Sequence, residues 1–147
     1  MKINKQGFTL VELLAVIALL AILTGITVPN ILSTINNNKK NAFLMDAKRM
    51  VAKAEYLKTK NKEERDYIQD NPTTGITYNL SSLNEAGEFL QDADGSPYES
   101  ASVKVTYDKT NKVYKYCIQV IGKKRTIGAS GCLDSSELTG IDKVIDR

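Results

Sequence analysis

The sequence of 147 residues contains no histidine and no tryptophan, and its only cysteines are Cys117 and Cys132. Histidine is the most common general base of enzymes and the most common metal ligand, so its absence excludes most hydrolase and metalloenzyme mechanisms. The sequence also offers no catalytic triad, no metal-ligand cluster and no phosphate-binding loop. It therefore predicts a protein that is not an enzyme and that holds no cofactor and no metal.

An excess of charge of one sign is also lacking. Lys and Arg number 20 and Asp and Glu number 17, a net charge of +3. This is too small to predict a nucleic-acid partner from bulk charge. Hydrophobic residues make up 42% of the chain and charged residues 25%, an ordinary composition for one folded domain. The hydrophobic residues are, however, concentrated at the N-terminal end.

The longest apolar run covers residues 8–28 and carries a single charge, at Glu12. At about 1.5 Å per residue, a helix over this run would be roughly 32 Å long, enough to cross the apolar core of a bilayer. Lys2 and Lys5 precede the run, and positive charge beside a membrane span stays in the cytoplasm. We therefore expect a transmembrane helix over residues 8–28, with the rest of the chain outside the cell.

Three interpretations of this run compete. A secretory signal peptide needs a small-residue cleavage site after its core, and residues 24–33 contain no clear one. A plain membrane anchor leaves Glu12 unexplained, because a charged side chain at the centre of a span costs about 2.5–3.5 kcal/mol on insertion scales. In the third interpretation, Glu12 has a positively charged partner.

The run GFTLVE at residues 7–12 resembles the processing site of type IV pilins and pseudopilins. This resemblance implies a leader at residues 1–7, which prepilin peptidase removes by cutting between Gly7 and Phe8. It also implies N-methylation of Phe8 and an assembly contact between Glu12 and the terminal amine of Phe8 in a neighbouring subunit. Such a contact is physically reasonable, because a carboxylate in an apolar bundle is tolerated when a fixed positive charge meets it.

The same resemblance implies a structural subunit of a type IV pilus, a helical surface filament for adhesion, twitching motility, biofilm formation or DNA uptake. The implied partners are further copies of the chain, prepilin peptidase, the assembly ATPase with its platform protein, the cytoplasmic membrane before assembly, and a host surface or DNA. The alternatives are a pseudopilin of a type II secretion or competence system, a minor pilin, and a membrane-anchored extracellular binding module. The Lys- and Asn-rich composition indicates a Gram-positive source.

Beyond the apolar run, the helix is expected to continue over residues 29–60 and to become amphipathic. Gly25 and Pro29 predict a helix kink, because proline removes a backbone donor and crowds the preceding turn; alternatively, Pro29 marks the membrane exit. One helical face is apolar and is expected to pack on the head: Phe43, Ala47, Met50, Ala54 and Leu57. A basic cluster favours a solvated or subunit-facing surface over a DNA site: Lys39, Lys40, Lys48, Arg49 and Lys53.

Residues 61–147 are expected to form the extracellular head. Its first part, residues 61–75, predicts a loop, and Ser82 with Glu85 predicts the N-terminal cap of a short helix. Residues 92–97 predict a turn rather than a calcium loop, because they lack the spacing and the terminal Glu of such loops.

Alternating patterns predict strands over residues 102–107, 113–121 and 125–127, the first two forming an antiparallel hairpin. The predicted fold class is α+β, with a long N-terminal helix packed against a small antiparallel sheet, as in the pilin fold.

Cys117 and Cys132 are 15 positions apart, without the spacing of a metal site or a base for a catalytic thiol. The predicted orientation places both outside the cell, where disulfides persist, and this favours a bridge over two free thiols. The bridge would be similar to the C-terminal disulfide loop of many pilins. In the chain-entropy model it would stabilise the fold by about 3 kcal/mol.

Overall fold

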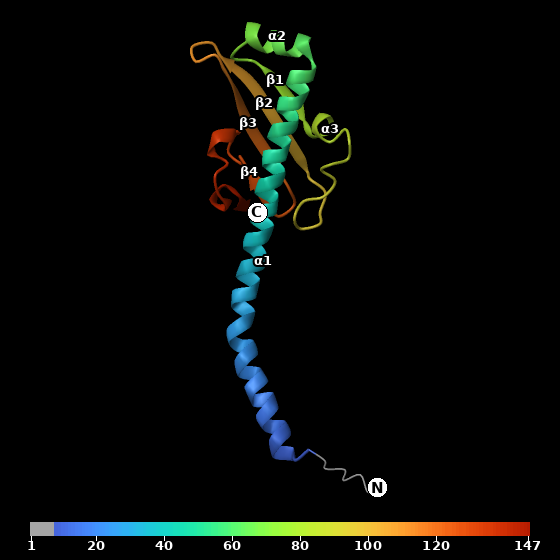
Figure 1. Cartoon of the computed structure of the whole chain (residues 1–147), viewed down its shortest axis with the longest axis vertical. Coiled ribbons are helices and arrows are strands. Elements are labelled where there is room, and N and C mark those ends of the chain that lie inside the picture. The colour runs from blue at the N-terminus through green and yellow to red at the C-terminus, as the bar shows by residue number, and fades with distance from the viewer. Residues whose placement is uncertain (1–7) are drawn as a thin grey trace, which may run out of the picture. The chain divides into compact units, whose positions relative to one another are not determined.

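The computed structural model describes residues 8–147, except for the side chains of residues 26–30 (Figure 1). The predicted leader at residues 1–7 lies outside the described residues. The chain divides into two compact units, Met1–Asn36 and Asn37–Arg147. From here on, the head means this second unit, which is longer than the predicted head at residues 61–147 because it includes the C-terminal part of the long helix.

Helix α1 runs from Leu10 to Lys60. Its backbone is helical through Gly25 and Pro29. The helix kink predicted at these two residues stays a prediction. No helix in the described part of the chain is long and apolar enough to cross a membrane. Residues 26–28 of the predicted transmembrane helix are among those whose side chains are not described.

The head contains a small antiparallel sheet in the order β1-β2-β3-β4-β6, with β5 paired to β3. β2 and β3 form the long hairpin at its centre, with Ser100 opposite Ile121 at one end and Asp108 opposite Val113 at the other. The strands are β1 (Ile76–Asn79), β2 (Ser100–Asp108), β3 (Val113–Ile121), β4 (Arg125–Ile127), β5 (Leu133–Asp134) and β6 (Ile145–Asp146). The three predicted strands are confirmed, β3 and β4 with the predicted bounds.

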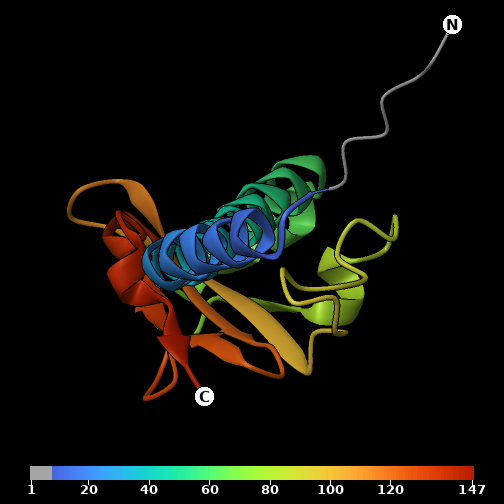
Figure 2. The same cartoon turned by 90° about the horizontal axis from the view of Figure 1, so that it is seen from below.

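The core lies between the sheet and the part of α1 that belongs to the head. Figure 2 shows the strands gathered on one side of the green part of α1. The predicted apolar face of the helix is confirmed, since four of its members are fully buried and Leu57 packs against them. The sheet contributes side chains that alternate along β2 and β3, as a half-buried pleated surface requires: Val103, Val105, Ile118 and Val120. The predicted α+β fold class is thereby confirmed.

Two predictions about the segment after α1 are wrong. Residues 61–75 are not only a loop, because they contain α2 (Lys62–Asp70), which the Asn61 side chain caps by accepting bonds from the N–H groups of Glu63 and Glu64. The predicted cap at Ser82 is also wrong, since α3 (Leu80–Leu83) begins before it and has Asn79 as its N-cap. Two short 3₁₀ turns, η1 (Ser135–Glu137) and η2 (Ile141–Lys143), complete the described elements.

Candidate assembly site

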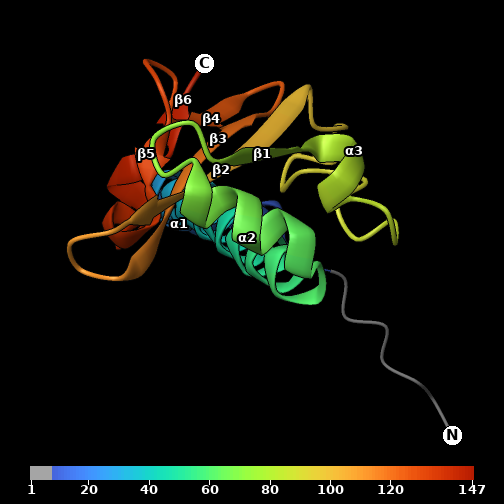
Figure 3. The ribbon, with the colours of Figure 1, turned by 90° about the horizontal axis from the view of Figure 1, so that it is seen from above.

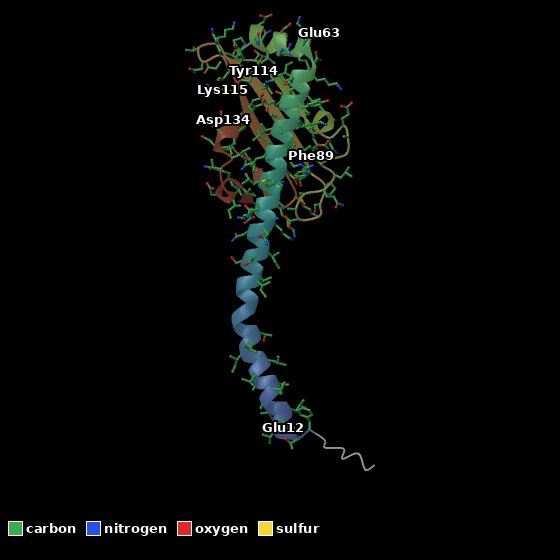
Figure 4. All side chains as sticks on the ribbon, in the orientation of Figure 1. Glu12, Glu63, Phe89, Tyr114, Lys115 and Asp134 are labelled. Atoms are coloured by element: carbon green, nitrogen blue, oxygen red, sulfur yellow. A yellow bond between two sulfur atoms is a disulfide. The ribbon has the colours of Figure 1, made fainter. Side chains whose placement is uncertain are left out.

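The start of α1 is closed by reciprocal hydrogen bonds between Thr9 and Glu12. Glu12 Oε2 accepts from the Thr9 backbone N–H at 2.9 Å and from the Thr9 hydroxyl at 2.8 Å, while the Glu12 N–H donates to Thr9 Oγ1 at 3.3 Å. This arrangement is a capping box, which satisfies backbone donors that the first turn of a helix leaves without partners. Figure 4 shows Glu12 at this end of α1. The Thr-x-x-Glu spacing was visible in the sequence, but we interpreted Glu12 only as an assembly contact.

The cap leaves Glu12 available for a further contact. Its side chain is exposed, and among the residues that the structure describes no cation forms an ion pair with it. Phe8 precedes the cap and is 82% exposed. Gly7, on the other side of the predicted cleavage bond, lies outside the described residues. The structure therefore places the predicted methylation site and the predicted assembly carboxylate at the same end of α1.

The first turns of α1 expose apolar side chains on every side. From Phe8 to Leu23, the large apolar side chains are 47–82% exposed. An apolar surface of this extent marks a site of contact with a membrane or with other protein surfaces. We therefore expect this apolar segment to contact a membrane or other protein surfaces. Glu12 is the one charged residue in the apolar run at residues 8–28.

The basic cluster predicted on α1 does not form a row of free cations. Most of its members form ion pairs with carboxylates of the head: Lys39 with Asp94 at 3.0 Å, Lys40 with Asp146 at 2.8 Å, Arg49 with Asp46 at 3.2 Å, and Lys53 with Glu88 at 3.6 Å. Lys48 is exposed. These ion pairs are a structural role of the cluster that its sequence pattern does not indicate.

Arg125 is a second charged group whose position the sequence did not indicate. It is buried in the head, where its guanidinium forms ion pairs with Asp94 and, at 3.5 Å, with Asp146. The neighbouring turn is held by Asp92 Oδ1, which accepts from the N–H groups of Asp94 at 2.9 Å and Ser96 at 3.0 Å. Within the described residues, no group of His, Cys, Asp and Glu side chains is placed to hold a metal ion.

Lys58 lies in an aromatic setting near the end of α1. Its Nζ donates to the Tyr116 hydroxyl at 2.8 Å and sits 3.7 Å from the centre of the Tyr114 ring. Gln69 of α2 donates to the Tyr114 hydroxyl at 2.7 Å. Burial lowers the pKa of Lys58 and raises the pKa of Tyr116 to about 12. The alternation of Tyr114 and Tyr116 along β3 was the signal for this cluster, which ties α1 and α2 to the sheet.

The disulfide between Cys117 and Cys132 is present, with a Cα–Cα distance of 5.3 Å. Next to it, β5 pairs with β3, with Asp134 opposite Cys117. The bridge thus holds the segment after β4 against the central hairpin.

A long helix packed against a small antiparallel sheet, with a capped apolar N-terminal segment, is an α+β arrangement consistent with the pilin fold. Residues 2–28 match the family model of the prokaryotic N-terminal methylation motif, the class III signal of type IV pilins and pseudopilins. The resemblance found in the sequence is confirmed, and the motif supports a type IV pilin-like or pseudopilin protein. No curated protein and no solved structure matches the chain.

The motif also has implications for processing and for location. A signal of this type implies processing by prepilin peptidase and assembly into pilus-like filaments. It also suggests a protein that is first anchored in a membrane and then assembled at the surface.

Proposed function

We propose that this chain is the structural subunit of a type IV pilus and has no catalytic role. The observation that carries the proposal is the methylation motif over residues 2–28, whose described part leads into a helix with apolar side chains exposed on every side from Leu10 to Leu23. In this proposal the peptidase cuts between Gly7 and Phe8, the amine of Phe8 is methylated, and the part of the first unit that remains in each copy enters a helical bundle. The heads then form the filament surface.

The polar contact at Glu12 would set the register of the bundle. A helix that leaves a bilayer for a protein bundle passes from one apolar environment to another, so apolar burial gives little net driving force and packing and polar contacts matter more. A carboxylate in such a bundle is stable when a cation meets it. The terminal amine of Phe8 in a neighbouring copy supplies that cation, while Thr9 keeps the Glu12 side chain folded over its own helix end.

The test replaces Glu12 by alanine in the full chain. We expect Glu12→Ala to be expressed and cleaved, and to give much lower filament yield in the fraction sheared from cells. The matched control is Glu63→Ala, which removes an exposed glutamate from α2 of the head and is expected to assemble normally. Mass spectrometry of the mature N-terminus reports cleavage and methylation separately from assembly. Normal filament yield from Glu12→Ala would refute the assigned role.

The same motif is shared by pseudopilins and minor pilins, so the type of filament needs its own measurement. Electron microscopy of sheared cells separates long surface fibres, expected for a major pilin, from short envelope-bound assemblies, expected for a pseudopilin. An N-terminal methylated Phe8 favours either of these over a membrane-anchored binding module, for which an intact Met1 is expected.

A further inference from the structure

Among the described strands, β1 lies at the edge of the sheet and pairs only with β2. In an antiparallel pair, the N–H and C=O of one residue point to the same neighbour, and the direction alternates along the strand. The Tyr107 N–H donates to the carbonyl of Pro72, on the β1 side, at 3.3 Å. By alternation, Val105 and Val103 of β2 also direct their backbone groups toward β1.

This alternation turns Thr77 and Asn79 of β1 away from β2, and Asn79 also serves as the N-cap of α3. Val105 is opposite Ile76 and Val103 is opposite Tyr78, so Ile76 and Tyr78 take the hydrogen bonds of the ladder. Thr77, between them, directs its N–H and C=O away from β2. Among the described residues, no turn, loop or side-chain hydrogen bond involves either group. The edge therefore offers the backbone N–H and C=O of Thr77 to a further strand.

A groove of about 900 Å³ runs along this edge. It lies among the end of α1, the start of α2, β1 and α3, and Figure 3 shows β1 leading directly into α3. Its volume is within the usual range for ligand sites. Its lining combines apolar side chains with hydroxyl groups: Leu57, Ile76, Thr77, Tyr78, Ser81 and Ser82.

Charges of both signs stand around the groove. Glu63 and Glu85 line it together with Lys60 and Lys62. A fifth charged group is already engaged, because the Tyr78 hydroxyl donates to Glu64 Oε2 at 2.5 Å. A rim of mixed sign does not match a polymer of one charge such as a nucleic acid. It matches a polypeptide segment that carries both acidic and basic side chains.

We propose that this groove binds an extended polypeptide segment of another molecule, which adds as a strand to the open edge of β1. Backbone N–H and C=O groups of a strand are complementary to those of a second strand, and this recognition mode gives affinity through the main chain and selectivity through alternate side chains. An apolar side chain of the ligand would rest on Leu57 and Ile76, and its charged side chains would meet the rim. The inference is independent of filament assembly.

The test uses the full-length chain in detergent micelles and a synthetic peptide with the sequence of residues 101–108 of β2, the strand that β1 already accepts on its other side. Lys104 and Asp108 give this peptide one charge of each sign. We expect the peptide to shift the amide resonances of β1, α3 and the start of α2. Thr77→Pro should weaken binding at least tenfold, because it removes the outward N–H and leaves the ladder to β2 intact. Thr77→Ala keeps that N–H and is expected to bind as the natural chain does.

A second peptide, N-methylated at every residue so that neither edge can donate a hydrogen bond, protects the test against misfolding of Thr77→Pro. We expect it not to bind the natural chain. The proposal is overturned if the unmodified peptide causes no shifts up to about 2 mM, beyond the weak end of specific binding. It is also overturned if the N-methylated peptide binds equally well, or if folded Thr77→Pro retains full affinity.

Discussion

Removing the disulfide should destabilise the head mainly through the unfolded state. The bridge joins residues 15 positions apart, and the chain-entropy model gives about 3 kcal/mol for a loop of this size. Cys132 is exposed and Cys117 half-buried, so replacing both by alanine leaves little cavity to add to this figure. The head spans Asn37–Arg147, and at typical unfolding entropies a loss of 3 kcal/mol lowers its melting temperature by about 13 °C.

The assay is urea unfolding of the full chain in detergent, followed by tyrosine fluorescence. It compares the oxidised chain, the reduced chain and the variant Cys117→Ala with Cys132→Ala. We expect the reduced chain and the variant to agree with each other and to unfold with a larger denaturant slope than the oxidised chain, because an uncrosslinked unfolded state exposes more surface. A stability difference below about 1 kcal/mol would show that the loop is already restricted in the reduced unfolded chain and would refute the entropic argument.

Two further perturbations test the packing of the head. Gly75→Ala should cost at least about 2 kcal/mol more than Gly87→Ala in urea unfolding: both glycines have positive φ, but only at Gly75 would a methyl group collide with the carbonyl of Val105. Equal losses would contradict this account. Since burial raises the pKa of Tyr116 from 10.0 to about 12, the folded chain keeps a proton that the unfolded chain releases, and stability should fall between about pH 10 and pH 12. Tyr116→Phe should flatten this decline in chemical denaturation measured across the same pH range, and an unchanged slope would argue against the assignment.

The sequence predicted those elements whose pattern repeats over several residues. The apolar face containing Phe43 and Met50 recurs at helical spacing over four turns, and β3 combines length with alternation, so both were visible without tertiary information. β1 has four residues and α2 has nine, too few for periodicity to separate them from a loop. Asn61 was the readable signal for α2, as an N-cap residue before a run of helix formers.

Ion pairs between residues distant in the sequence were less predictable than helices and strands. Arg125 meets Asp94 across 31 positions, and no local pattern specifies such a pair. At the candidate assembly site, the motif identified Gly7, Phe8 and Glu12, but it did not show that Glu12 also caps its own helix. The capping spacing from Thr9 was the local signal for that second role.

The ion pairs of α1 affect how any salt dependence of this protein should be interpreted. A binding constant that falls with added salt is the usual evidence for contacts with phosphate groups. Here Lys39 and Lys40 form ion pairs that join α1 to the turn at residues 92–97 and to β6. Added salt screens these ion pairs, which stabilise the head. A salt-sensitive filament would therefore be expected even without a nucleic-acid ligand. Only a comparison with the stability of the head at the same salt concentration separates the two causes.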